Sequence, residues 1–311
     1  MSVFTPVSQQ QLEAMLVEYP IGKLVQFSGI DVGTDNSNYF VDTTEGQFVL
    51  TLFERLTTEE LPFYLSLGDQ LSEANCLVAR PIHDNQGEAL NQLAGKPAVL
   101  FQRLSGHHIT TPQVNHCQQM GHALAKMHSA DLVFQRVPEN EFGLKWVSGY
   151  RDFNGWQESD DKDLFESLLS EFSSLNQVDL PKGVIHADLF HDNALFNDGD
   201  LAGVIDWYFA CFDWLLLDLA IMINDWCFDG DTIDRDKKAA LLLAYTDVRI
   251  LTEVEQKMLP VMQLFAACRF WLSRTLAWSE LRDQAQAGIT IKPPKEMKRL
   301  LLSILKENNT M

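Results

Sequence analysis

Residues 184–206 contain the feature that most restricts what this chain can fold into. The segment VIHADLFHDNALF sets polar residues between two apolar runs, and a third apolar run, GVIDW, follows the turn at 197–200. As a strand-loop-hairpin unit it brings Asp188, Asn193 and Asp206 to neighbouring strand ends. Carboxylate and amide oxygens suit Mg²⁺, and a free carboxylate can accept a hydroxyl proton. The segment therefore indicates phosphoryl transfer, with a polar hairpin whose aspartates cap turns as the structural alternative.

Composition excludes several classes of partner. The chain has 311 residues, 46% of them hydrophobic, and so can bury the core of one large domain or of two lobes. Its net charge of −19 argues against nucleic acid or an anionic membrane surface, because both require a basic face. A small-molecule substrate is the remaining expectation.

Export signals and membrane anchors are not indicated by the sequence. The opening MSVFTPVSQQ lacks the basic start and apolar core of a secretory signal. The most apolar segment, 214–223, is shorter than the roughly 20 residues of a membrane span and carries Asp218. The five cysteines are scattered without a CxxC pair, which is typical of a reduced protein without disulfides or a zinc cluster. We expect a cytoplasmic protein, and the sequence leaves its oligomeric state open.

Hydrophobic periodicity divides the chain into a strand-rich N-terminal third and a helical remainder. The first part reads as helix, three strands, helix and two strands, at 8–19, 23–30, 38–44, 47–54, 57–75, 77–83 and 98–104. The second reads as helices at 113–129, 158–175, 214–228, 234–246, 252–285 and 295–307, with a small antiparallel β insert at 183–207. The pattern predicts an α+β protein with domains at 1–104 and 105–311.

The spacing of the polar residues resembles a known catalytic arrangement. His186, Asp188 and Asn193 follow the pattern H-x-D-L-x-x-x-N, and an apolar strand ending in Asp206 comes after it, as in the protein-kinase-like fold. With the later DLA at 218–220, the pattern resembles the aminoglycoside phosphotransferase and choline kinase superfamily.

A closer resemblance, to the type II homoserine kinases, covers nearly the whole chain. It is carried by MSVFTPV at 1–7, GTDNSNYFV at 33–41, FVLTLFE at 48–54, LAIMINDWC at 219–227 and CRFWLSR at 268–274. The resemblance implies a bilobal protein-kinase-like fold. Its N-terminal lobe is small, β-rich and nucleotide-binding, with an antiparallel sheet, and its larger, mainly helical C-terminal lobe holds the catalytic loop and the substrate site.

The resemblance also implies roles for the residues of the motif. Asp188 is expected to be the catalytic base, and Asn193 and Asp206 are expected to hold Mg²⁺ for a reaction that uses ATP. His186 is expected to brace the loop. Asp218 stands where the superfamily has an aspartate that ties the catalytic loop to the following helix.

The N-terminal part departs from the wider kinase pattern. Gly33, Ser37 and Asn38 in the loop GTDNSN are the candidate phosphate contacts, although a solvated hairpin turn explains this loop equally well. Thr51 stands where kinases of this fold carry a lysine on the third strand. Arg55 is the candidate replacement, with a surface ion pair as its alternative. The adenine contacts are expected along the connector at 98–106.

A zwitterionic amino acid needs an anion for its ammonium group and a cation for its carboxylate. Asp225 is the candidate ammonium partner, and Arg269 and Arg274 are the candidate carboxylate partners. Each of the three also has a simpler interpretation as a charge on a helix surface.

The expected function is ATP-dependent phosphorylation of the side-chain hydroxyl of L-homoserine to O-phospho-L-homoserine, a step of threonine biosynthesis. A kinase for another small alcohol, such as choline, an aminoglycoside, methylthioribose or a sugar, is the alternative within the same class. A nucleotide-binding pseudokinase or regulator is the alternative from a different class, because Thr51 replaces the usual lysine.

Overall fold

A computed structural model describes residues 4–30, 36–282 and 292–308. The chain divides into two compact units. The first runs to Gly106 and includes 131–136 and 202–205, and the second contains the rest. The expected domain boundary near residue 104 lies close to the end of the first segment. No helix in these described ranges is both long enough and apolar enough to cross a membrane.

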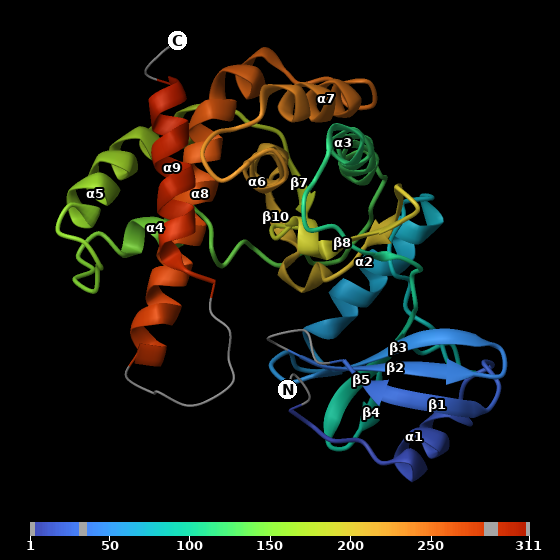
Figure 1. Cartoon of the computed structure of the whole chain (residues 1–311). Helices are drawn as coiled ribbons and strands as arrows, with labels where there is room; N and C mark the ends of the chain where they lie inside the picture. The colour runs from blue at the N-terminus through green and yellow to red at the C-terminus, as the bar shows by residue number, and fades with distance from the viewer. Residues whose placement is uncertain (1–3, 31–35, 283–291, 309–311) are drawn as a thin grey trace. The chain divides into compact units, whose positions relative to one another are not determined.

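The first unit is built on a five-stranded antiparallel sheet in the order β1-β2-β3-β5-β4 (Figure 1). Its strands are β1 (Leu24–Gly29), β2 (Asn36–Thr43), β3 (Gly46–Phe53), β4 (Asn91–Leu93) and β5 (Lys96–Gln102). Helix α1 (Gln9–Leu16) begins at the expected position, with a capping box between Ser8 and Gln11. The predicted antiparallel sheet of this lobe is confirmed.

One face of this sheet packs against α1. Because side chains alternate along a strand, Tyr39 and Val41 of β2 and Leu50 and Leu52 of β3 all point to the same face. They form a buried cluster with apolar residues of α1, such as Leu12. Residues at the intervening positions, including Asn38 and Thr51, therefore point to the opposite face.

Two expectations for this unit are wrong. Residues 77–83 form no strand, only isolated bridges at Val78 and Pro81, because Pro81 has no N–H to donate to a ladder. The sheet is completed instead by the short β4. Helix α2 (Leu61–Glu73) starts later than its expected cap at Thr57, since Glu60 is the N-cap residue and its carboxylate accepts the Thr57 N–H.

The second unit is mainly helical, as expected. Its helices are α3 (Val114–His128), α4 (Leu144–Gly149), α5 (Asp161–Phe172), α6 (Leu215–Trp226), α7 (Arg235–Thr246), α8 (Glu253–Arg282) and α9 (Pro294–Asn308), with a 3₁₀ turn at Ser173–Gln177. The pairs α3/α7 and α8/α9 run side by side (Figure 1). A Cβ atom at Gly121 of α3 would collide with the Leu241 carbonyl oxygen of α7, so glycine permits this close approach. The short α4 was not predicted.

The hairpin expected around the turn at 197–200 is present in the β insert, but the strand that precedes the loop pairs elsewhere. Strand β7 (Lys182–Ile185) does not pair with the next strand, β8 (Ala194–Asn197), but with β10 (Cys211–Trp214), while β8 pairs with β6 (His107–His108). Strand β9 (Asp200–Val204) follows β8 after a tight turn. The catalytic loop therefore connects two strands that belong to different ladders.

Candidate active site

The catalytic loop leaves β7 and turns sharply at Ala187. This residue has φ +65°, a left-handed conformation that costs a non-glycine residue about 1–3 kcal/mol. Its N–H donates to Asp218 Oδ1 at 2.7 Å, and the His186 N–H donates to Asp218 Oδ2 at 2.6 Å. Asp218 is fully buried in the first turn of α6. Two charge-assisted hydrogen bonds thus hold the turn.

Asp218 is also one end of a buried polar chain. His128 Nε2 lies 3.4 Å from Asp218 Oδ2, and His128 Nδ1 lies 2.8 Å from the Tyr245 hydroxyl. Arg249 donates to the same hydroxyl at 3.2 Å and pairs with Glu255 at 2.9 Å. Burial alone would raise the pKa of Asp218, but the hydrogen bond and charge of His128 and the backbone N–H of His186 lower it. Asp218 therefore stays ionised as it holds the loop.

Asn193 and His186 orient Asp188. The Nδ2 atom of Asn193 donates to the Asp188 backbone oxygen at 2.8 Å and to Asp188 Oδ2 at 3.3 Å. The Asp188 N–H donates to His186 Nδ1 at 3.3 Å, and the His186 ring packs on Trp207 with centroids 4.5 Å apart. Because Asn193 uses its nitrogen toward Asp188, its amide oxygen remains for a cation. The geometry supports a bracing role for His186.

Asp206 lies near enough to Asp188 to change its charge state. It has φ +63° and ψ +57° and lies two residues after the end of β9. Burial raises the pKa of Asp188 to about 7, and the negative charges of Asp206 and Asp192 raise it as well, while Arg269 opposes them. Two carboxylates that repel one another beside an amide oxygen are a donor set that a divalent cation would neutralise.

A second acidic cluster lies elsewhere in the same unit. Glu158, Asp160 and Asp161 are close enough to share an ion, and they are the single such trio found within the described ranges. The Lys298 ammonium already lies among them, 2.6 Å from Glu158 Oε2 and 3.1 Å from Asp160 Oδ1. We therefore interpret this cluster as a structural ion-pair network between the start of α5 and α9.

The structure separates the expected phosphate contacts of the first unit. Ser37 is fully buried on the α1 face, where its hydroxyl accepts the N–H groups of Phe4 and Thr5 and donates to Glu54 at 2.7 Å. This use of Ser37 contradicts its expected role, because its hydroxyl anchors the N-terminal segment. Asn38 lies on the opposite face and accepts a 2.7 Å hydrogen bond from Thr51.

Arg55 and Gly33 are the two remaining candidates for phosphate contact. Arg55 is exposed just beyond β3. Gly33 lies outside the described residues.

Comparison with known proteins identifies the group to which this site belongs. Residues 26–251 match the phosphotransferase enzyme family. The chain belongs to this family. It is 40% identical over 309 residues to a homoserine kinase of Methylobacterium radiotolerans, covering 97% of this chain and 95% of that protein. A homoserine kinase of Pseudomonas aeruginosa is 40% identical over 305 residues, covering 97% and 96%.

Solved structures show the same fold for this phosphotransferase. An amicoumacin kinase matches with a TM-score of 0.72 at 15% identity, covering 96% of this chain and 92% of that chain. A spectinomycin phosphotransferase matches with a TM-score of 0.67 at 17% identity, and the match covers 97% of this chain and 99% of that chain. The expected protein-kinase-like α+β fold is confirmed.

The candidate substrate residues of this phosphotransferase fall into two groups. Arg269 is 3% exposed, and its strongest opposite charge is Asp188. Arg274 pairs with Glu296 at 3.1 Å and also interacts electrostatically with Asp225. The two arginines are five positions apart on α8, so they point from different sides of the helix. They therefore do not form one carboxylate clamp.

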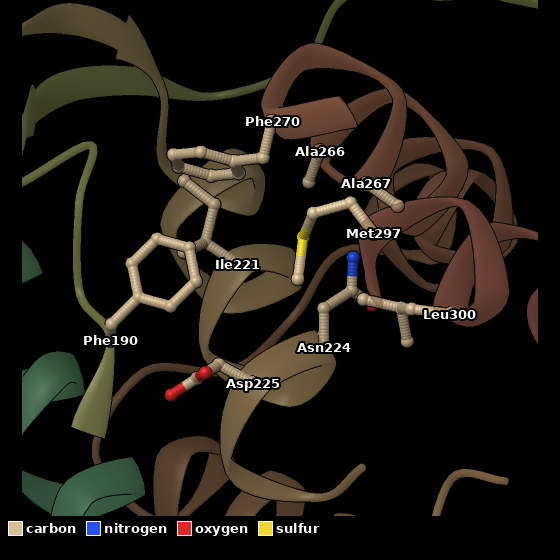
Figure 2. Close-up of a pocket in the computed structure, with 9 residues that line it drawn as sticks. All are labelled: Phe190, Ile221, Asn224, Asp225, Ala266, Ala267, Phe270, Met297 and Leu300. Carbon is tan, nitrogen blue, oxygen red and sulfur yellow. The ribbon is translucent and has the colours of Figure 1, made fainter. Parts of the chain in front are cut away.

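Asp225 lies at the edge of a pocket in the helical unit (Figure 2). The rings of Phe190 and Phe270 form one side of it, and its other lining residues are Ile221, Asn224, Ala266, Ala267, Met297 and Leu300. Asp225 Oδ2 accepts hydrogen bonds from the backbone N–H and from Nδ1 of His191, both at 2.7 Å. The hydrogen bond to Asp225 raises the pKa of His191. Phe190 is two residues from Asp188, so the pocket adjoins the catalytic loop.

Sequence reasoning missed His128 and His191. Neither residue occupies a fixed position of the H-x-D-L-x-x-x-N pattern. Yet His128 is four residues after the buried Leu124 and so lies on the buried face of α3, which was the available signal. Asp192, the residue before Asn193, is half exposed and pairs with Lys292 at 2.6 Å.

Proposed function

We propose that this phosphotransferase transfers the γ-phosphoryl group of ATP to the side-chain hydroxyl of L-homoserine. The observation that carries the choice of substrate is the 40% identity to homoserine kinases over nearly the full length of both chains. The observation that supports the chemistry is the orientation of Asp188 by Asn193 and by the turn that Asp218 holds.

In this proposal Asp188 is the general base. Its carboxylate accepts the hydroxyl proton as the substrate oxygen attacks the γ-phosphorus atom, and the bond from that phosphorus to the bridging oxygen of ADP breaks. The products are the phosphate ester, ADP and a proton on Asp188. Burial supports this role, because it brings the pKa of Asp188 to about 7, near the working pH of a base.

Asn193 and Asp206 are proposed to hold Mg²⁺. The fit rests on their oxygen donors and on the repulsion between the carboxylates of Asp206 and Asp188. Bound there, the ion would neutralise charge on the phosphate oxygens. Asn193 serves a second purpose at the same time, since its nitrogen keeps the Asp188 carboxylate in place.

The nucleotide phosphates are proposed to contact Asn38, Arg55 and Gly33. Asn38 shares its sheet face with Thr51, the position at which related folds carry lysine. Arg55 is the exposed cation next to the end of β3. Ser37 is no longer part of this set.

The amino-acid substrate is proposed to place its ammonium group at Asp225. Arg274, whose charge interacts with that of Asp225, is the proposed partner of the substrate carboxylate. Most of the side chains beside Asp225 are apolar, and in this proposal they contact the methylene groups of the substrate. All five cysteines are free, which suits the cytoplasmic location that we propose.

An acceptor panel tests this proposal. Purified protein with Mg-ATP is offered L-homoserine, choline, 3-aminopropan-1-ol, methylthioribose and an aminoglycoside, and both ADP release and the phosphorylated product are measured. We expect the highest kcat/KM with L-homoserine. Turnover of another alcohol without homoserine would reject the substrate, and ATP binding without transfer to any alcohol would support a regulator.

A further inference from the structure

Ala187 is held by buried charges through both of its backbone polar groups. Its N–H donates to Asp218, and its carbonyl oxygen accepts a 2.7 Å hydrogen bond from Nη2 of Arg269. The anion comes from α6 and the cation from α8. A non-glycine residue keeps a strained left-handed conformation only where its surroundings fix its backbone. At Ala187, hydrogen bonds from opposite charges on two helices fix it.

The guanidinium group of Arg269 is itself held in place. Its carbon lies 4.5 Å from the ring centroid of Phe270 and 5.9 Å from that of Phe142. The carboxylates of Asp188, Asp218 and Asp213 all act on it. Such a side chain has little freedom to move toward a substrate.

We infer that Arg269 is a positioning residue that grips the Ala187 carbonyl oxygen and so holds Asp188 in its catalytic orientation. The inference rests on the proposed function for the identity of the acceptor. It replaces the expectation that Arg269 acts as a carboxylate clamp.

One observation favours the alternative role of Arg269, in which it binds the carboxylate of the substrate. The Nη1 atom of Arg269 is buried and has no hydrogen-bond partner within the described part of the chain. A substrate carboxylate could take up this donor. The two roles differ in whether the effect of losing Arg269 depends on the carboxylate of the acceptor.

Two acceptors separate the roles. L-Homoserine and 3-aminopropan-1-ol share the ammonium group and the hydroxyl, and the second lacks the carboxylate. The kcat and KM for each are measured in the wild type, Arg269→Met, Arg269→Lys and Arg274→Met, with the exposed Arg235→Met as the matched control.

A positioning role predicts that Arg269→Met lowers kcat by the same factor for both acceptors, roughly 10–100-fold, as when an outer partner of a catalytic group is lost. Arg269→Lys, which keeps a charged donor, should restore part of kcat. Arg235→Met should match the wild type. A loss confined to KM for homoserine, with aminopropanol unaffected, would overturn the inference in favour of a clamp.

Amide hydrogen exchange of residues 184–194 gives a readout that does not depend on the acceptor. We expect faster exchange at Ala187 and Asp188 in Arg269→Met, with exchange in α7 unchanged. Unchanged protection at the loop would overturn the inference even if the wild type phosphorylates neither acceptor, a result that would itself reject the proposed function. Arg269→Gln replaces the methionine variant in both experiments if that variant does not fold.

Discussion

The Nδ2 atom of Asn193 lies 2.8 Å from the backbone oxygen of Asp188 and 3.3 Å from its carboxylate. One side chain thus orients the proposed base and turns its own carbonyl oxygen away from it. The proposed base and the proposed metal ligand are therefore coupled, so that a change at either residue should alter the geometry of the other.

Replacing the base tests the centre of the mechanism. Asp188→Asn keeps the size of the side chain but removes proton acceptance, and kcat should fall by about 10²–10⁴. Steady-state ADP release with homoserine measures the effect. Asp198→Asn is the matched control, because Asp198 lies in the β8–β9 turn with φ +50°, which asparagine tolerates. Near-normal kcat in the Asp188 variant would reject the assigned role.

The rate should depend on pH through the same group. Asp188 acts as a base only when ionised, and burial raises its pKa to about 7, so kcat/KM for the acceptor should fall as the pH drops through that region. A cation at Asp206 favours the ionised form and moves this limb to lower pH. A pH profile at saturating Mg-ATP measures it. Rates that rise on acidification from about pH 8 to about pH 5 would contradict the assignment.

Loss of a proposed metal ligand should raise the Mg²⁺ concentration that the reaction requires. Asp206→Asn removes a charged oxygen ligand, and we expect the Mg²⁺ concentration for half-maximal rate to rise by about 10–100-fold. Titration of Mg²⁺ at fixed ATP measures the change. The control is Asp200→Asn, because Asp200 is an exposed aspartate at the start of β9, the strand that precedes Asp206. An unchanged requirement would remove Asp206 from the metal site.

Lys298 should matter for stability and not for chemistry. It is nearly buried among three carboxylates, of which Asp161 is 2% exposed, so Lys298→Met leaves a buried charge without its partner. Breaking a buried pair costs about 3–5 kcal/mol, measurable by urea unfolding. Lys295→Met, at a more exposed position, should change stability by less than about 1 kcal/mol.

The stability difference should also depend on pH. Hydrogen bonds from Lys298 lower the pKa of Glu158 and of Asp160. The contribution of these two carboxylates to stability is present above their unfolded pKa values and is lost as the pH falls through their lower folded pKa values. The difference in the free energy of unfolding between wild type and Lys298→Met should therefore become smaller as the pH is lowered. A difference that grows in acid would contradict this account.

Ser37→Ala separates an anchor from a phosphate contact. The substitution leaves the N–H groups of Phe4 and Thr5 without their acceptor, and we expect the free energy of unfolding to fall by about 1–3 kcal/mol. The KM for ATP should stay unchanged. A raised KM without loss of stability would return Ser37 to the nucleotide site.

The extent of sequence-based prediction follows from how local each signal is. The capping box at Ser8, the strands β2 and β3 and the long helices depend on neighbouring residues and were predicted closely. The H-x-D spacing located Asp188, Asn193 and Asp206 for the same reason. The strand expected at 77–83 failed because Pro81 limits pairing.

Long-range relationships were not visible in the sequence. The pairing of β7 with β10, the contact between His128 and Asp218 and the use of Ser37 by the N-terminal segment each join residues far apart along the chain. Periodicity places such side chains on a face, but it does not identify the partner on the other element.

The pairing of β7 with β10 has a consequence for biosynthesis. A nascent chain that has left the ribosome only as far as residue 210 already contains Asp188, yet it lacks β10 and the helix that supplies Asp218. Nothing then fixes the turn at Ala187. The loop at 186–193 should therefore become ordered only late in translation, after β10 and α6 have left the ribosome.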